Sequence, residues 1–477
     1  MGQEINVTAF NQDDFSQFHH KLTQETQLLK SLVEHNQFSQ KSPTVGFEIE
    51  AWLIDDAMQA CPNNISFLEN LNDPLAFPEL AKFNIELNGN PEQLSGTVLS
   101  ALHNNLTYTW QSACMHAQKL NNHILIIGTL PTLKPSAMSL ENMSDMNRYR
   151  VLNEQILKAR GKPINLDIVG IEHLKFDHHD VMLESATTSL QLHTQVPLHY
   201  AHHFYNASII ASAAIVAVSA NAPYLFGKNL WHESRIPLFE QAIETGGYGG
   251  VIHGPLKRVS FGSGYARSSI MECFQENLEH FPVLLPELFS GPIENFEHLR
   301  LHNGTIWRWN RPLIGFDDDQ TPHIRIEHRT PSAGPTIIDS IANAAFYYGL
   351  TKNLCDEIIA TGIPMEFTQA KDNFYQAARF GLDSQVVWFD HEKHKLQKLL
   401  QSDLIIRARQ GLQSLNILPA DIDTYLGIIE QRIENKQTGS QWQREFMQQD
   451  HATLQSMTEI YLAHQYSETP VSQWELH

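Results

Sequence analysis

Residues 323–329 (HIRIEHR) constrain the fold more than any other stretch, because charged and apolar side chains alternate along them. In a β-strand, successive side chains point to opposite faces of the sheet. Arg325, Glu327 and Arg329 would then share one face, and the isoleucines between them would share the other. Charged side chains are costly to bury without a partner such as a metal, a phosphate or a carboxylate. We therefore expect the charged face to line a site; the alternative is an edge strand with solvated charges.

Three further segments show the same alternation. Each combines one apolar face with one face of acidic, amide or imidazole side chains. The polar faces carry Glu48 and Glu50 in the first segment, Asn84, Glu86 and Asn88 in the second, and Ser189, Gln191, His193 and Gln195 in the third. Coincidence explains four such strands poorly, so we predict that their polar faces line a common site.

The rest of the chain is predicted to be mainly helical. Amphipathic or apolar spacing favours helices over 13–40, 91–120, 146–160, 199–220, 336–350, 386–400, 404–415, 421–436 and 441–466, with a buried strand at 124–128. Residues 301–305 are typical of a hairpin turn leading into a strand over 306–311. We divide the chain into a catalytic domain (1–364) and a helical C-terminal extension packed on it (365–477).

The composition is acidic. The chain has 33 Lys and Arg against 53 Asp and Glu, a formal net charge of −20, which argues against binding to nucleic acids or anionic membranes. The apolar run 208–222 is too short to span a bilayer, so we expect a buried helix there. The four widely spaced cysteines form no paired metal motif, and no secretory signal is readable. We expect a cytoplasmic enzyme that acts on small molecules, as a monomer or a homo-oligomer.

The glutamates of the polar faces predict bound cations, since carboxylates gathered in one cleft cannot all stay ionised unless cations compensate them. Oxygen ligands with a single imidazole, that of His193, favour magnesium or manganese over zinc. Arg311, Arg325 and Arg329 favour a multiply charged anion, such as a nucleotide phosphate or an acyl phosphate. Metals together with arginines indicate phosphoryl transfer.

Other groups of residues leave alternatives open. His199, His202 and His203 share a helix face and are either zinc ligands or ordinary surface residues, and no fourth ligand lies nearby. Arg148 and Arg150 are either anion contacts or solvated residues on a helix. The glycine-rich stretches 246–250 and 262–264 do not match a phosphate-binding loop, so flexible turns or a lid are expected.

The motifs follow one another in a fixed order: 46–50 (GFEIE), 84–88 (NIELN), 190–193 (LQLH), 219–227 (SANAPYLFG), 304–311 (GTIWRWNR) and 325–329 (RIEHR). This ordered set resembles the glutamate-cysteine ligase and carboxylate-amine ligase family, over roughly residues 44 to 350. The resemblance implies a glutamine-synthetase-like α+β fold. Such a fold has a curved, mainly antiparallel sheet with helices packed behind it, here followed by a helical C-terminal part.

The resemblance also implies a reaction and roles for single residues. By motif, the metal ligands would be Glu48, Glu50, Glu86, His193 and Glu327. Arg329 and Arg325 would act on the transferred phosphoryl group, and the substrates would contact Arg235, Arg311, Gln191 and Asn88. The implied activity is ATP- and magnesium-dependent ligation of an acid to an amine through an acyl phosphate, with glutamate and cysteine as first candidates. The alternatives are a noncatalytic descendant that binds a nucleotide or a protein, and a metal-dependent amide hydrolase.

Overall fold

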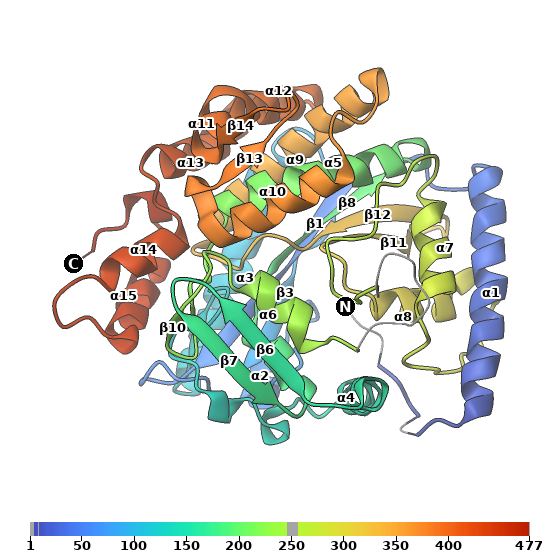
Figure 1. The fold of residues 1–477 in the computed structure, drawn as a ribbon, viewed down its shortest axis with the longest axis horizontal. Coiled ribbons are helices and arrows are strands. Elements are labelled where there is room, and N and C mark those ends of the chain that lie inside the picture. Colours follow the sequence, from blue (N-terminus) through green and yellow to red (C-terminus); the bar gives the residue numbers. More distant parts are fainter. Residues whose placement is uncertain (1–3, 8, 246–255, 477) are drawn as a thin grey trace.

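The computed structural model describes residues 4–7, 9–245 and 256–476 (Figure 1). Its centre is a curved antiparallel sheet in the order β11-β12-β8-β1-β3-β2, and β4 and β5 also pair with β1. These strands are β1 (Thr44–Ile54), β2 (Ala76–Pro78), β3 (Asn84–Asn88), β4 (Glu92–Gln93), β5 (His123–Leu125), β8 (Leu190–Val196), β11 (Asn310–Phe316) and β12 (Pro322–His328). The predicted α+β fold with a curved, mainly antiparallel sheet is confirmed.

The register of the sheet brings the predicted polar faces together. Residues directly opposite each other in an antiparallel pair lie on the same face. The facing pairs are Glu48 and Gln191, Glu50 and Glu86, and Glu327 and His193. The isoleucines of β12 point the other way and are buried. The expectation that these strands share one polar face is confirmed.

Two long apolar helices cover the other face of the sheet. α5 (Ala201–Val218) contacts β11 and β12 and packs along α9 (Ile337–Thr361), with α10 (Phe367–Phe380), α12 (Ile405–Ser414) and α13 (Pro419–Glu434) beside them (Figure 1). Nearly every residue of α5 is buried, as expected of a helix that is apolar all round. Within the described residues, one stretch, Leu198–Val218, has the length and mean hydropathy (1.3) of a membrane span, but 89% of it lies inside the protein. The predicted buried helix is confirmed.

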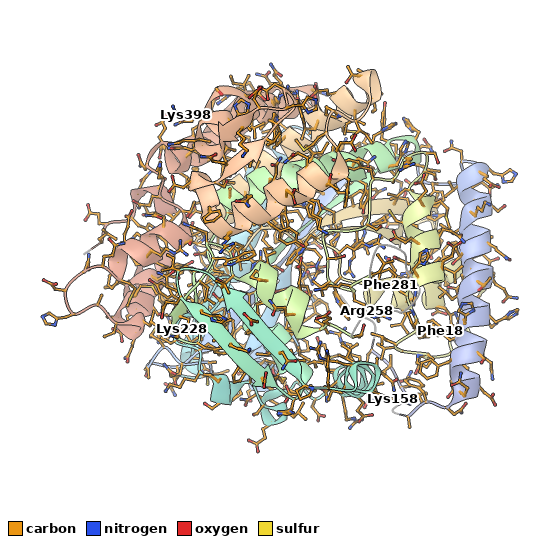
Figure 2. The ribbon with its side chains drawn as sticks, in the orientation of Figure 1. Phe18, Lys158, Lys228, Arg258, Phe281 and Lys398 are labelled. Carbon is orange, nitrogen blue, oxygen red and sulfur yellow. The ribbon has the colours of Figure 1, made fainter. Side chains whose placement is uncertain are left out.

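Further helices and short strands lie around the sheet. At one end, α1 (Gln12–Glu34) runs beside α7 (Met271–His280) and α8 (Glu297–Gly304), and Phe18 of α1 stacks edge-on with His298 of α8 (Figure 2). The other α-helices and strands before residue 243 are α2 (Asn64–Leu71), α3 (Val98–Lys119), α4 (Asn147–Arg160), β6 (Ile164–Val169), β7 (His173–His178), β9 (Tyr224–Leu225), β10 (Lys228–Asn229) and α6 (Arg235–Ala242).

The C-terminal helices pack directly on the rest of the chain. After α13 come α14 (Gly439–Phe446) and α15 (Leu454–Tyr466), and a short α11 (Leu396–Leu399) precedes α12. Buried Arg432 of α13 donates to Asp339 of α9 at 2.6 Å, and Tyr461 of α15 donates to the Ile126 carbonyl at 3.0 Å. Such contacts join the two parts, so the division at residue 364 stays a prediction.

Two local predictions near the sheet are wrong. Residues 91–93 do not open a helix, because Glu92 and Gln93 form β4 beside β1 and α3 starts only at Val98, after Gly96 with its positive φ of 63°. Residues 301–305 are not a hairpin turn. They form the last turn of α8, whose final residue is Gly304. The next strand begins at Asn310 instead of residue 306.

The C-terminal helix predictions are wrong in two places. Residues 385–395 form a hairpin of β13 (Gln385–Val387) and β14 (Lys393–Lys395), with His391 of its turn at a φ of 63°. The predicted helix over 441–466 is two helices, because Thr453 starts α15 with a capping box after the chain has left α14. The glycine-rich stretch 246–250 lies outside the described residues.

Candidate active site

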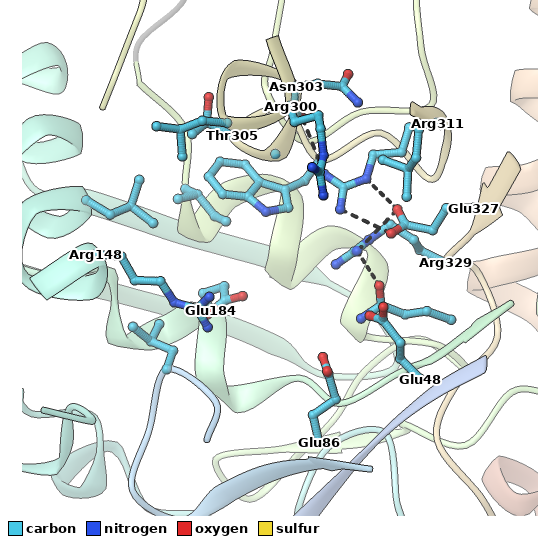
Figure 3. A pocket seen from close by; sticks show the side chains of 18 of the residues that line it. Glu48, Glu86, Arg148, Glu184, Arg300, Asn303, Thr305, Arg311, Glu327 and Arg329 are labelled. Atoms are coloured by element: carbon cyan, nitrogen blue, oxygen red, sulfur yellow. Dashed lines mark hydrogen bonds and ion pairs between the residues drawn. The ribbon is translucent and has the colours of Figure 1, made fainter. Parts of the chain in front are cut away.

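A cavity of about 480 Å³ lies against the polar face of the sheet (Figure 3). The strands supply one wall, and α4, α8 and neighbouring loops supply the others. The predicted site residues that line the cavity are Glu48, Glu50, Glu86, Gln191, His193, Arg311, Arg325, Glu327 and Arg329. The four strands of alternating sequence therefore contribute to one cavity, as expected from their polar faces.

The Glu327 carboxylate is the centre of the charged group. It is 1% exposed, accepts hydrogen bonds from Nε and Nη2 of Arg311, and lies 3.3 Å from Nη1 of Arg329. Burial alone would raise its pKa, but Arg311 and Arg329 lower the pKa of Glu327 to about 2. Glu327 is therefore ionised at neutral pH and holds both guanidinium groups at the wall of the cavity.

Glu48, His193 and Glu327 form a group that suits a metal ion. One ligand atom from each lies within 4.8 Å of the others. His193 is 6% exposed, and its Nε2 lies 3.2 Å from Glu48 and 4.0 Å from Glu327 without a well-directed hydrogen bond to a described residue. A buried imidazole nitrogen between two carboxylates is typical of a metal ligand. Two carboxylates with one imidazole fit magnesium or manganese, the ions predicted from the sequence.

A second pair of carboxylates, Glu50 and Glu86, lies beside this group. Glu50 accepts hydrogen bonds from the backbone and hydroxyl of Ser189 at 2.7 and 3.0 Å, and Glu86 accepts one from Asn88 at 2.9 Å. Burial raises the pKa of both groups, and the charge of Glu48 helps to raise the pKa of Glu86 to about 7. A divalent cation would favour their ionised forms, but neither carboxylate belongs to the converging group of three ligand atoms found among the described residues, so their role as metal ligands stays a prediction.

The arginines of the cavity differ in how they are held. Gln191 accepts a hydrogen bond from Arg329 and donates one to Glu50 at 2.8 Å, so it orients Arg329. Arg325 lines the cavity, but no hydrogen bond or ion pair of its guanidinium reaches another residue in the described part of the chain. A bound anion can therefore contact Arg325 without displacing a protein partner. Direct contact of Gln191 with a substrate stays a prediction.

Two of the predicted substrate contacts do not line this cavity. Arg235 is 2% exposed and donates to Glu233 at 2.8 Å and to the Thr330 carbonyl at 2.7 Å. It faces a small neighbouring cavity that it shares with Arg329. Asn88 lies opposite Glu48 on β3 and uses its amide to hold Glu86. Their roles toward substrate stay predictions.

The cavity also has residues that the sequence patterns did not assign to it. These are Glu79, Tyr149, Glu184 and Arg300, together with Arg148, whose role the sequence left open. Glu79 lies in a loop, Glu184 in a 3-10 helix of six residues and Arg300 in the short α8, where no strand alternation marks them. The one signal was a lone carboxylate, Glu184, in the otherwise uncharged run 181–187. Among the described residues, the three histidines at the start of α5 bring no set of three ligand atoms together, so the zinc alternative gains no support.

Comparison with known proteins places this site in a family. Residues 44–466 match the description of glutamate-cysteine ligase family 2. The chain belongs to this family. The glutamate-cysteine ligase of Francisella tularensis, whose structure was solved in complex with AMP, is similar with a TM-score of 0.56 and 12% identity, over 92% of this chain and 91% of that one. A search of curated proteins gives no match.

A second solved structure has the same fold. The bifunctional glutathione synthetase of Pasteurella multocida gives a TM-score of 0.52 and 10% identity, over 92% of this chain and 54% of that one. At such low identity, both likenesses establish the glutamine-synthetase-like ligase fold and leave substrates open. Membership of glutamate-cysteine ligase family 2 therefore rests on the match over residues 44–466, which includes all four polar strands.

Proposed function

We propose that this protein is an ATP-dependent carboxylate-amine ligase that forms an amide or γ-glutamyl bond through an acyl phosphate. The observation that carries the proposal is the position of Glu327. Its carboxylate belongs at once to the group that suits a metal ion and to the ion pairs with Arg311 and Arg329. A metal ion and an anion that bind on either side of one residue would lie next to each other. This arrangement suits a phosphate that is bound to a metal ion and contacted by arginines.

The reaction would take place in two steps. In the first, a carboxylate oxygen of the acid attacks the terminal phosphorus of ATP, the bond to the bridging oxygen breaks, and ADP leaves. In the second, the amine attacks the acyl carbon, the carbon–oxygen bond to phosphate breaks, and inorganic phosphate leaves as the amide forms. No covalent enzyme intermediate is needed, so positioning and charge neutralisation carry the catalysis.

The residues of the chain divide this work between them. A magnesium ion held by Glu48, His193 and Glu327 would neutralise phosphate charge when bound. Arg329, fixed by Gln191 and Glu327, would stabilise the transferred phosphoryl group. Arg325 has no protein partner among the described residues and would bind a phosphate or a substrate carboxylate directly. We name glutamate and cysteine as the first substrates to test, on the strength of family membership.

The proposal is tested by measuring ADP release with ATP, magnesium, L-glutamate and L-cysteine, and with each component left out. A ligase requires the acid and the amine together. Release of an amine from an amide without ATP would instead support a hydrolase, and binding of ATP without turnover in any combination would support a noncatalytic descendant. Arg325→Met should lower turnover while the protein stays folded, with Arg267→Met on the surface as the matched control.

A further inference from the structure

Glu184 is a carboxylate in the cavity for which the proposed function so far has no use. It lies across the cavity from Arg311 and Glu327, close to Arg148 (Figure 3). It also lines the small neighbouring cavity, together with Glu50 and Arg329. No hydrogen bond or ion pair reaches its carboxylate from any described residue, whereas Glu50, Glu86 and Glu327 all have such partners. A half-buried carboxylate that lines a cavity, and that no described residue binds, is free to contact a ligand there.

Hydrogen bonds hold the backbone around Glu184 in place. The 3-10 helix Val181–Ala186 is capped by Asp180, which accepts from Met182 at 2.9 Å, and is tied to α4 because Asn153 accepts from Val181 at 3.1 Å. The Glu184 carbonyl accepts from the Thr187 hydroxyl at 2.9 Å. The neighbouring Met182 and Leu183 are fully buried.

The groups nearest to Glu184 are two further carboxylates and two guanidinium groups. Glu50 and Glu79 lie near enough to interact with it electrostatically, and Arg329 and Arg148 oppose them. Burial, with the charge of Glu50, raises the pKa of Glu184 to about 7. A metal ion is a poor occupant, because it needs several converging ligands and Glu184 belongs to no group of three whose ligand atoms converge in the described part of the chain. An ammonium group needs only one or two acceptors.

The proposed reaction supplies such a group. Free α-amino groups have a pKa of about 8 and alkylamines of about 10, so an amine substrate arrives in neutral solution mainly as an ammonium ion. It must be held beside the acyl phosphate, hence beside Arg329. We propose that Glu184 is a specificity-determining residue that binds the amine substrate as an ammonium ion, whose nitrogen then loses a proton to water before it attacks the acyl carbon. This inference rests on the proposed function and adds the subsite for the second substrate.

The test compares a charged nucleophile with an uncharged one. With L-glutamate and ATP held at saturation, kcat/KM is measured at pH 7 for L-cysteine, which carries an ammonium group, and for hydroxylamine, which is uncharged. Glu184→Gln keeps the size of the side chain and removes its charge. It should lower kcat/KM for L-cysteine at least tenfold, mainly through KM, and lower the value for hydroxylamine less than threefold. Glu184→Asp, which keeps the charge, should restore part of the loss.

Every other outcome overturns the inference. Equal losses with both nucleophiles would mean that Glu184 supports the fold or the phosphate site, and a raised KM for glutamate would assign it to the acid. No change would remove it from binding altogether. Glu154→Gln on the exposed face of α4 is the control for a lost surface charge. If wild-type protein releases no ADP with any acid and amine, the proposed function itself fails. If wild type is active and Glu184→Gln keeps the wild-type ratio of kcat/KM for L-cysteine to kcat/KM for hydroxylamine, only this inference fails.

Discussion

Replacing Glu327 by Gln should both stop turnover and destabilise the metal-free protein. A pKa lowered from 4.5 to about 2 means that the folded protein stabilises the ionised carboxylate by about 3 kcal/mol, at about 1.4 kcal/mol for each tenfold change in the ionisation constant. Glutamine cannot supply that charge, and it leaves Arg311 and Arg329 buried without their carboxylate. Removing one partner of a buried pair typically costs about 3 to 5 kcal/mol, in agreement with this value.

The assay is urea unfolding of wild type and variant in the presence of a chelator, together with ADP release. We expect a loss of about 3 kcal/mol, which leaves a protein of ordinary stability folded, and a fall in turnover of at least about a hundredfold. Glu240→Gln is the matched control for stability. Glu240 is half-buried and accepts hydrogen bonds from Trp309 at 2.9 Å and Tyr375 at 2.7 Å. Loss of solvent around its carboxylate raises its pKa, so replacing it by the neutral glutamine should cost less than about 1 kcal/mol. Equal losses in the two variants would refute the argument from paired charge.

Three further results should follow from buried carboxylates elsewhere. Burial opposes the ionisation of Asp317, but hydrogen bonds from Ser39 and other residues lower the pKa of Asp317 from 3.8 to about 2. The ionised form therefore stabilises the fold above pH 3.8, and this stabilisation should disappear as the pH falls toward 2. Urea midpoints measured against pH should fall less in acid for Asp317→Asn than for wild type. Asp339→Asn should lower the free energy of unfolding by about 3 kcal/mol, because it leaves the buried charge of Arg432 without its carboxylate and with the neutral oxygens of Val218 and Asn343 as acceptors. A single urea transition should persist if α13 and α9 unfold together. Glu25→Ala should lower the free energy of unfolding by about 2 kcal/mol, because Glu25 accepts a hydrogen bond from the Leu299 backbone at 2.7 Å and so anchors α8. Since α8 lines the cavity, KM for a substrate should rise as well. An unchanged melting temperature and KM would contradict this prediction.

The predictable part of the site was the part carried by strands. Alternation placed Glu48 and Glu50 on one face of β1, and the same rule placed Glu327 on the same face of β12 as Arg325. Which strands would be neighbours did not follow from alternation. The register that sets Glu50 opposite Glu86, and His193 opposite Glu327, depends on contacts far apart in the sequence.

The unpredicted part of the site lies outside the strands. Glu184 lies in a 3-10 helix of six residues and Arg300 in an α-helix of eight residues, and both helices are too short for a periodic pattern to identify. The sequence around Gly304 predicts a hairpin turn, but Gly304 is the last residue of α8. Glycine and proline mark where a regular element stops, and the surrounding contacts decide which element it is, as with Pro91 before β4.

The most direct test of the central claim follows an oxygen atom. The acid substrate, L-glutamate, is prepared with heavy oxygen in its side-chain carboxylate and incubated with ATP, magnesium, L-cysteine and the protein. If the reaction passes through an acyl phosphate, one labelled oxygen moves from the carboxylate to the inorganic phosphate for each amide formed, and ADP is the other product. Amide formation with unlabelled phosphate, or with AMP in place of ADP, would contradict the proposed mechanism.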